Sequence, residues 1–272
     1  MITVTGATGN VGRPLVEALT AAGEQVATVA RGEAAPAEGV THHRADLAEP
    51  ETLKPALDGA EALFVLTAGD FIVRGDMGAL MDVARASGVR RVVLLSSHGV
   101  GTGRHASNLE AAVMESGLEW TMLRPGNFAS NAYAWAGSVQ ERRVVEAPFG
   151  DTAIPAVDPA DIAAVAALAL REPGHAGRIH TLTGPDAVSP RQQAAAIAAA
   201  IGEPVGFTEL TREEARARML GFMPERVVDA TLGALGEPSP AEQRPTPDVE
   251  QVLGRPATSF AEWAKRNAAA FR

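Results

Sequence analysis

The sequence has no cysteine, one tyrosine and only two lysines, Lys54 and Lys265. The absence of cysteine excludes disulfide bonds and thiol chemistry. Because no stretch holds about 18 uninterrupted apolar residues, we expect no membrane span. No basic segment followed by an apolar segment marks a signal peptide, so we expect a cytoplasmic protein.

Basic residues are fewer than acidic ones, 24 against 33. The formal net charge is −9, and no long run of basic residues is present, which argues against nucleic acid or an anionic membrane as a partner. The 272 residues, 46% of them hydrophobic, suffice for a substantial core. We therefore expect a small-molecule substrate and either a monomer or a homodimer.

The scarcity of tyrosine and lysine limits the chemistry. A tyrosine followed four residues later by a lysine is a common proton-transfer pair in enzymes. The single tyrosine is Tyr133, and the residue four positions later is Gly137. That pair therefore cannot exist in this chain.

The most informative stretch is the first twelve residues, MITVTGATGNVG. Residues 2–5 are typical of a buried strand, and the apolar spacing becomes helical after residue 11. In the glycine turn between them (residues 6–12), Gly6 permits a tight turn, Gly9 lets the backbone approach phosphates, and Gly12 lets helix and strand lie close. The order strand, glycine turn and helix N-terminus predicts a dinucleotide-binding site.

Residues that follow later predicted strands extend this site. Arg31 follows the second strand, where an arginine accommodates the 2′-phosphate of NADP, which favours NADP(H) over NAD(H); Glu33 is the acidic alternative. Asp46 either lies beside the adenine or caps the helix predicted at residues 50–57. The complete set of expected cofactor-binding residues is Gly6, Thr8, Gly9, Asn10, Val11, Gly12, Arg31, Asp46, Leu47, Thr67, Ala68 and Ser96.

Strand and helix patterns alternate about six times within the first ~125 residues, which predicts a parallel, doubly wound sheet. We expect an α/β protein with a Rossmann domain at residues 1–150 and a smaller α/β substrate lobe at residues 151–272, interleaved with the first. Arginine, proline and glycine at positions 124–126 mark the end of the regular alternation.

Several motifs together resemble the NmrA-like atypical short-chain dehydrogenases/reductases, in particular their NAD(P)H:quinone-oxidoreductase-like members. The matching features are the glycine turn, Arg31, DL at 46–47, LLSS at 94–97, Glu110, ESGLEWT at 115–121, LRPGNF at 123–128, Asn131, IPAVDPADI at 154–162, LTGP at 182–185, Phe260 and Trp263. The resemblance covers essentially the whole chain. It implies NAD(P) binding but no particular substrate.

The chain departs from this family at two positions. Where many relatives have a lysine four residues before Glu110, this chain has Ala106, and where a typical short-chain reductase has its tyrosine, it has Thr102. These changes weigh against carbonyl reduction by the usual mechanism. They leave open direct hydride transfer to a quinone or another strong acceptor, in which the cofactor itself carries most of the chemistry.

Candidate proton donors flank the predicted nicotinamide region. We consider His98, His105 and Ser97 as catalytic candidates because histidine exchanges protons near neutral pH and a serine hydroxyl polarises a carbonyl. The alternatives are solvated loop histidines, and serines that cap the turn and bind the cofactor. Arg124 is expected to be structural. We predict no metal site, because His42, His43, His175 and His180 have no partners at ligand spacing.

The segment after the last predicted Rossmann strand is rich in aromatic and amide side chains, which suit a flat or apolar substrate. The expected substrate-binding residues are Phe71, Asn127, Phe128, Asn131, Tyr133 and Trp135; packing within the smaller lobe is the alternative for Trp135.

The leading hypothesis is an NADPH-dependent oxidoreductase that transfers hydride to a small quinone-like or conjugated carbonyl acceptor. A non-catalytic NADP(H)-binding redox sensor and an enzyme with non-redox chemistry, such as cyclisation or dehydration, are the alternatives.

Overall fold

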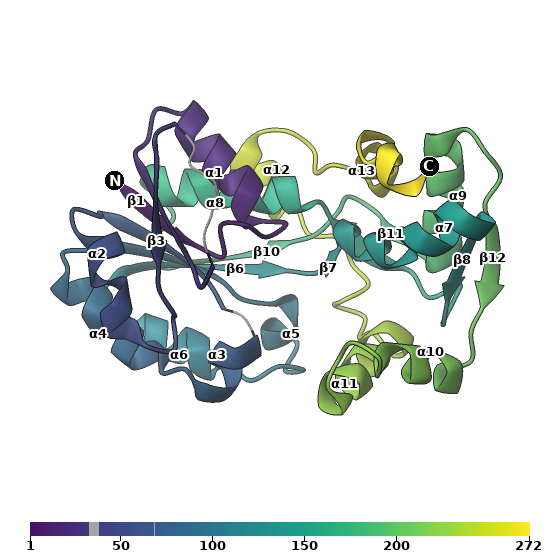
Figure 1. Cartoon of the computed structure of the whole chain (residues 1–272), viewed down its shortest axis with the longest axis horizontal. Coiled ribbons are helices and arrows are strands. Elements are labelled where there is room, and N and C mark those ends of the chain that lie inside the picture. Colours follow the sequence, from purple (N-terminus) through teal and green to yellow (C-terminus); the bar gives the residue numbers. More distant parts are fainter. Residues whose placement is uncertain (33–37, 68) are drawn as a thin grey trace. The chain divides into compact units, whose positions relative to one another are not determined.

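The structure is a computed structural model that describes residues 1–32, 38–67 and 69–272 (Figure 1). The chain divides into two compact units that are interleaved along the sequence. The first unit comprises Met1–Pro125, Pro159–Leu182 and Asp248–Arg255, and the second comprises Gly126–Asp158, Thr183–Pro247 and Pro256–Arg272.

The first unit is built around a parallel sheet of seven strands in the described part of the chain, in the order β10-β6-β5-β4-β1-β2-β3. Its strands are β1 (Ile2–Thr5), β2 (Val26–Ala30), β3 (Val40–Arg44), β4 (Ala62–Leu66), β5 (Arg91–Leu95), β6 (Glu119–Pro125) and β10 (Arg178–Leu182). The central strands are continuous apolar runs because both faces of a parallel sheet are covered. Leu63 and Phe64 of β4 are fully buried.

Helices cover both faces of this sheet, with α1 and α8 on one face and α2, α4 and α6 on the other (Figure 1). The helical segments of the first unit are α1 (Gly12–Ala21), the 3-10 turn Pro50–Leu53, α2 (Lys54–Leu57), α3 (Gly69–Arg74), α4 (Met77–Ala86), α5 (His98–Gly101), α6 (Asn108–Glu115), α8 (Pro159–Arg171) and α12 (Asp248–Leu253). This arrangement confirms the predicted Rossmann-like α/β fold.

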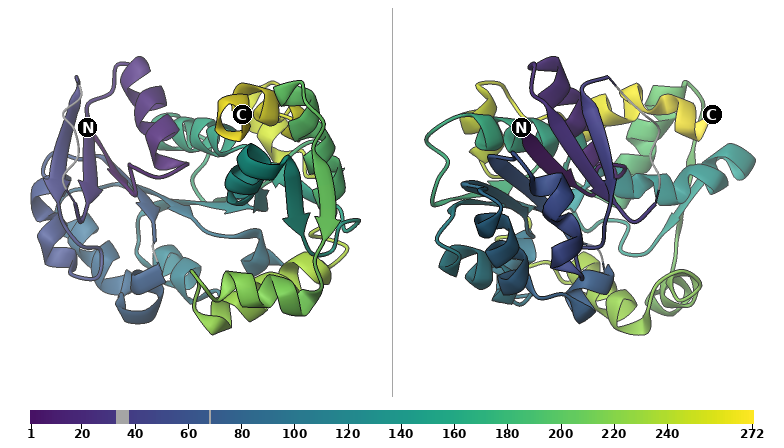
Figure 2. Two further views of the ribbon diagram at one scale, coloured as in Figure 1. Left: turned by 45° about the vertical axis from the view of Figure 1, so that its right-hand side comes forward. Right: turned by 60° about the vertical axis from the view of Figure 1, so that its left-hand side comes forward.

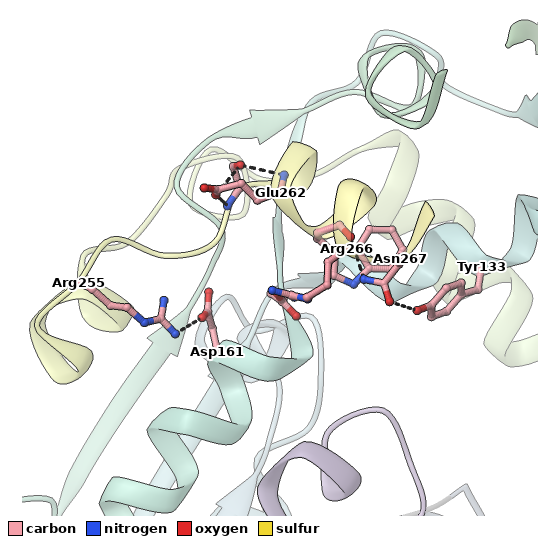
Figure 3. A network of polar contacts seen from close by, with 9 residues as sticks. Tyr133, Asp161, Arg255, Glu262, Arg266 and Asn267 are labelled. Carbon is pink, nitrogen blue, oxygen red and sulfur yellow. Dashed lines mark hydrogen bonds and ion pairs between the residues drawn. The ribbon is translucent and has the colours of Figure 1, made fainter. Parts of the chain in front are cut away.

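Two contacts tie α12 and Arg255, two residues after the end of this helix, into the first unit. The carboxylate of Asp248 accepts the backbone N–H of Thr181 in the edge strand β10 at 2.5 Å. Arg255 forms a 2.7 Å ion pair with the buried Asp161 of α8 (Figure 3). These contacts explain why residues 248–255 belong to the unit that carries the large sheet.

The second unit has two small sheets. One has the order β11-β9-β7, and β8 and β12 pair side by side in the other (Figure 2). The strands are β7 (Asn127–Phe128), β8 (Val144–Ala147), β9 (Ile154–Val157), β11 (Ala187–Val188) and β12 (Gly206–Glu209).

The helices of the second unit pack around two apolar clusters. One includes Trp263 and Phe271, and the other includes Ala215 of α10 and Val228 of α11. The helical segments are the 3-10 helix Ala129–Trp135, α7 (Ala136–Arg142), α9 (Pro190–Ile201), α10 (Arg212–Met219), α11 (Glu225–Gly236), α13 (Phe260–Arg266) and the 3-10 turn Ala268–Phe271. Capping boxes begin α9, α10 and α13, where a serine or threonine bonds the N3 backbone and the N3 side chain bonds back. In the residues that the structure describes, no helix has both the length and the apolar character to span a bilayer.

Candidate functional site

The glycine turn has the geometry that its spacing predicts. Gly6 has a φ of +64°, in the left-handed region that glycine adopts without strain. A Cβ at Gly12 would lie 2.1 Å from the carbonyl oxygen of Gly6, so only glycine fits where α1 crosses the turn. By contrast, a Cβ at Gly9 would approach only the Gly6 oxygen, at 3.3 Å. Gly12 is therefore required by packing, whereas Gly9 lies on the open side of the turn.

The start of α1 is suited to an anion. Val11 is the N-cap residue and supplies no side-chain hydrogen bond, and the first turn contains no acidic residue. Thr8, Gly9 and Asn10 are exposed beside it. The helix dipole and the first N–H groups of a ten-residue helix favour a phosphate at such a position. The described residues therefore fit the pyrophosphate of a dinucleotide.

The remaining predicted cofactor residues follow other strands of the same sheet. Arg31 follows β2 and is exposed. The Asp46 carboxylate accepts the backbone N–H of Ala48 at 3.0 Å. The helical turn that follows has Glu49 as its N-cap residue, so the alternative that Asp46 caps that helix is wrong. Asp46 lies too early in the chain for that position and instead closes its own turn.

The structure describes two of the remaining candidate residues, Leu47 and Thr67. Leu47 packs against the core of the first unit, and Thr67 is half-buried directly after β4. Glu33 and Ala68 lie outside the described residues.

A buried ionic group lies behind the carboxyl end of β5. Glu110 of α6 is 2% exposed, and its two oxygens accept bonds from Arg124 Nε at 2.9 Å and Nη2 at 2.6 Å. The Ser96 hydroxyl donates to the same carboxylate at 2.5 Å. Burial raises the pKa of the Glu110 carboxyl, but the bonds from Arg124 and Ser96 outweigh it and hold that pKa below its usual value. In turn, the bond to Glu110 raises the pKa of Arg124. This pairing fits the expected structural role of Arg124.

Ser97, the residue after Ser96, forms a second polar pair with His105. The Ser97 side chain caps α5 by accepting the Gly99 N–H at 3.1 Å, and it lies 3.0 Å from His105 Nδ1. A Cβ at Gly99 would lie 2.6 Å from His105 Nδ1, so the imidazole ring packs directly on the glycine. The structure thus brings two of the three catalytic candidates together.

The other positions of this region are also described. His98 begins α5 and is half-buried. Thr102 is half-buried and its hydroxyl donates to the Gly99 carbonyl at 3.3 Å, while Ala106 is exposed. Thr102 and Ala106, the two departures from the family pattern, are thus close in sequence to His105.

The predicted substrate residues fall into two groups. In the second unit, the Tyr133 hydroxyl donates to Asn267 Oδ1 at 2.6 Å (Figure 3), and its ring stacks on Phe271 at 6.1 Å between centroids. Asn131 donates to Asn127 at 2.8 Å. Phe128 is half-buried in β7, and Trp135 packs partly against the apolar cluster. In the first unit, Phe71 is only 3% exposed and belongs to the hydrophobic core.

Sequence reasoning did not connect Glu110 with Ser96 and Arg124. Fourteen residues separate Glu110 from each partner, and an isolated glutamate in a helix carries no signal for such pairing. It also missed that His175 Nδ1 and His180 Nε2 lie 3.3 Å apart. Within the described residues, no group of three or more histidine, aspartate or glutamate side chains is arranged to hold a metal ion.

Comparisons with known proteins agree with this geometry. A family model described as NAD(P)H-binding matches residues 6–173. The chain is 37% identical to an NAD(P)H azoreductase of Xenophilus azovorans, over 100% of this chain and 99% of that protein. It is 36% identical to a (4-alkanoyl-5-oxo-2,5-dihydrofuran-3-yl)methyl phosphate reductase of Streptomyces griseus, with the same coverage.

A solved structure is also similar over nearly the full length of the chain. It is an NADPH-dependent quinone oxidoreductase of Escherichia coli in complex with NADPH, with a TM-score of 0.82 and 26% identity over 98% of this chain and 99% of that chain. With more than half of its length matched by the family model, the chain belongs to the NAD(P)H-binding family.

Proposed function

We propose that this protein is an NADPH-dependent oxidoreductase that transfers hydride to a small quinone-like or conjugated carbonyl acceptor. The observation that carries the proposal is the glycine turn, in which a Cβ at Gly12 would lie 2.1 Å from the Gly6 oxygen. The similarity to reductases over the whole chain adds to it.

In this proposal the glycine turn holds the pyrophosphate, and Arg31 binds the adenosine 2′-phosphate of NADPH. Asp46 and Leu47 lie at the adenine, and Thr67 and Ser96 border the nicotinamide. Bound NADPH supplies the hydride. One hydride and one proton together convert a quinone to its hydroquinone, so the protein needs a proton source.

We assign the proton to the Ser97–His105 pair. In its protonated state, the imidazole donates from Nδ1 to the Ser97 hydroxyl, which keeps the ring oriented, and from Nε2 to the oxygen of the acceptor. The Gly99 N–H donates to the Ser97 oxygen. Because Gly99 has no side chain, the imidazole ring of His105 packs directly on its backbone. This pair would take over the proton-transfer role for which Thr102 and Ala106 are unsuited.

For the substrate we propose the second unit as the substrate lobe, with contacts from Asn127, Phe128, Asn131, Tyr133 and Trp135. Tyr133 is 38% exposed although its hydroxyl is held by Asn267. A partly exposed aromatic side chain whose hydroxyl is held in place suits stacking on a flat acceptor. Because Phe71 is buried in the core of the first unit, we leave it out of this set.

The decisive experiment identifies the co-purifying nucleotide by mass spectrometry and then follows NADPH oxidation at 340 nm across quinones, azo dyes and enones. We expect NADP(H) and turnover with at least one acceptor class. Tight NADP(H) binding without any turnover would overturn the proposal in favour of a redox sensor. Substrate conversion without nucleotide oxidation would instead indicate non-redox chemistry.

A further inference from the structure

His42 connects the edge strand β3 to the turn that carries Arg31. Its Nε2 lies 2.8 Å from the carbonyl oxygen of Gly32, the residue after Arg31, and its Nδ1 lies 3.0 Å from the hydroxyl of Thr28. Thr28 is 5% exposed and stands opposite His42 in the register of β2 and β3. The imidazole therefore links the body of β2 to the turn that follows that strand.

The chemistry of the two partners determines how this ring is used. The Gly32 carbonyl can only accept, so the hydrogen of the ring lies on Nε2 and is donated to that carbonyl. In a neutral ring Nδ1 then accepts the Thr28 hydroxyl hydrogen. Both ring nitrogens are thus satisfied, and the buried hydroxyl fixes the orientation from which the ring reaches Gly32.

Gly32 has no side chain through which the turn could pack. A Cβ placed there would meet no described atom within 4 Å. The bond from His42 therefore restrains a backbone that steric contact leaves open. Restraining the backbone of a binding residue before the ligand arrives reduces the conformational entropy lost on binding.

We infer that His42 is a positioning residue that sets the preference for NADPH over NADH by fixing the turn from which Arg31 meets the 2′-phosphate. The inference rests on the proposed use of NADPH and of Arg31. It adds a residue that touches neither the phosphate nor the hydride. The effect should be confined to the 2′-phosphate, because the pyrophosphate is held separately at the glycine turn.

The next residue offers a matched control. His43 is a histidine on the same strand, pairs with Val29 in the register and is also half-buried. Successive side chains of a strand point to opposite faces, so His43 stands on the other face from His42. Replacing it changes the composition of β3 without touching the bond to Gly32.

The test compares His42→Leu, His42→Gln and His43→Leu by steady-state kinetics with NADPH and NADH, and by calorimetric binding of NADP⁺ and NAD⁺. In His42→Leu, loss of the hydrogen bond to Gly32 should weaken NADP⁺ binding and raise the KM for NADPH about three- to tenfold. We expect kcat and the NADH parameters to stay unchanged. The glutamine amide can donate to Gly32, so His42→Gln should recover most of the preference, and His43→Leu should behave as the wild type.

Equal changes for NADPH and NADH, or no change in His42→Leu, would overturn the inference. An Arg31→Ala variant separates this failure from failure of the proposed function. If Arg31→Ala loses the NADP⁺ preference and His42→Leu keeps it, only the role of His42 is wrong. If the wild type binds NAD⁺ as tightly as NADP⁺, the proposed NADPH specificity is wrong as well. The binding arm gives its answer even when no acceptor is reduced.

Discussion

The carboxyl ends of β1 and β5 lie in the same parallel sheet, but they are built by different means. After β1, the glycine turn consists of backbone, and its key feature is the missing side chain of Gly12. After β5, the structure depends on side chains: Ser96, Glu110 and Arg124 form a buried group, and Ser97 contacts His105.

In the proposed function, this difference separates cofactor binding from proton transfer. A site made of backbone requires glycine at set spacings, so it can be recognised from a short sequence motif. A site made of side chains combines residues from several helices and strands. Each of these residues can be replaced only if its contacting partners change as well. Four predictions, ordered by decreasing effect, test this difference.

The first prediction concerns the backbone site. Gly12→Ala places a Cβ 2.1 Å from the Gly6 oxygen, and we expect the free energy of unfolding to fall by about 4 kcal/mol or more. Urea unfolding followed by circular dichroism measures it. Gly137→Ala is the control, because a Cβ there meets nothing within 4 Å in α7; it should be neutral or stabilise by up to about 1 kcal/mol. Equal stability of the two variants would show that the turn tolerates side chains.

The second prediction concerns the buried pair. Arg124→Met leaves the Glu110 carboxylate buried without its cation, and we expect a loss of about 3–5 kcal/mol at neutral pH. The pKa of Glu110 in the folded variant should then rise above its unfolded value, so the loss should shrink as pH falls. Adding Glu110→Met should restore most of the stability. A single variant as stable as the double one would contradict the proposed pairing.

The third prediction concerns proton transfer. His105→Gln should lower kcat with a quinone by about 100-fold while the KM for NADPH changes little. Since Ser97 and His105 are proposed to act as one unit, the double variant Ser97→Ala with His105→Gln should be no slower than the slower single variant. Independent, multiplying effects in stopped-flow turnover would show that the two side chains act separately.

The fourth prediction concerns a side-chain pair that is remote in the chain from both strand ends. Burial lowers the pKa of His175 and of His180. The nearby Arg91 and Arg178 lower these pKa values further, whereas Glu172 and Asp248 raise them. The unfolded chain therefore takes up protons at higher pH than the folded one. Stability should be fully present above about pH 6.5 and fall as the pH drops below it.

Urea unfolding at pH 7.5 and at pH 5, with His180→Gln for comparison, measures this dependence. The variant should lose less stability between the two pH values than the wild type does. An unchanged pH dependence would mean that the histidine pair contributes nothing to it.

Much of the first unit was predictable because its signals are local. The apolar runs at β4 and β5 and the glycine turn lie within a few residues each. Such elements are determined by nearest neighbours in the chain.

The remaining features depend on contacts between distant residues. The bond from Tyr133 to Asn267 spans 134 positions, and β7 is only two residues long, so neither has a local pattern. The pairing of β10 with β6 follows from the path of the chain through α8, not from the composition of β10. Whether the glycine turn, Arg31 and the Ser97–His105 pair act as proposed stays a prediction.

The bond between Asp248 and the N–H of Thr181 has a consequence for solubility. An open edge strand presents unpaired N–H and C=O groups to which a strand from another molecule can add. At β10, the Asp248 carboxylate accepts one of those N–H groups and adds negative charge, and the helix that carries it, α12, contacts the strand. The short return of the chain at residues 248–255 thus protects the sheet against edge-to-edge aggregation.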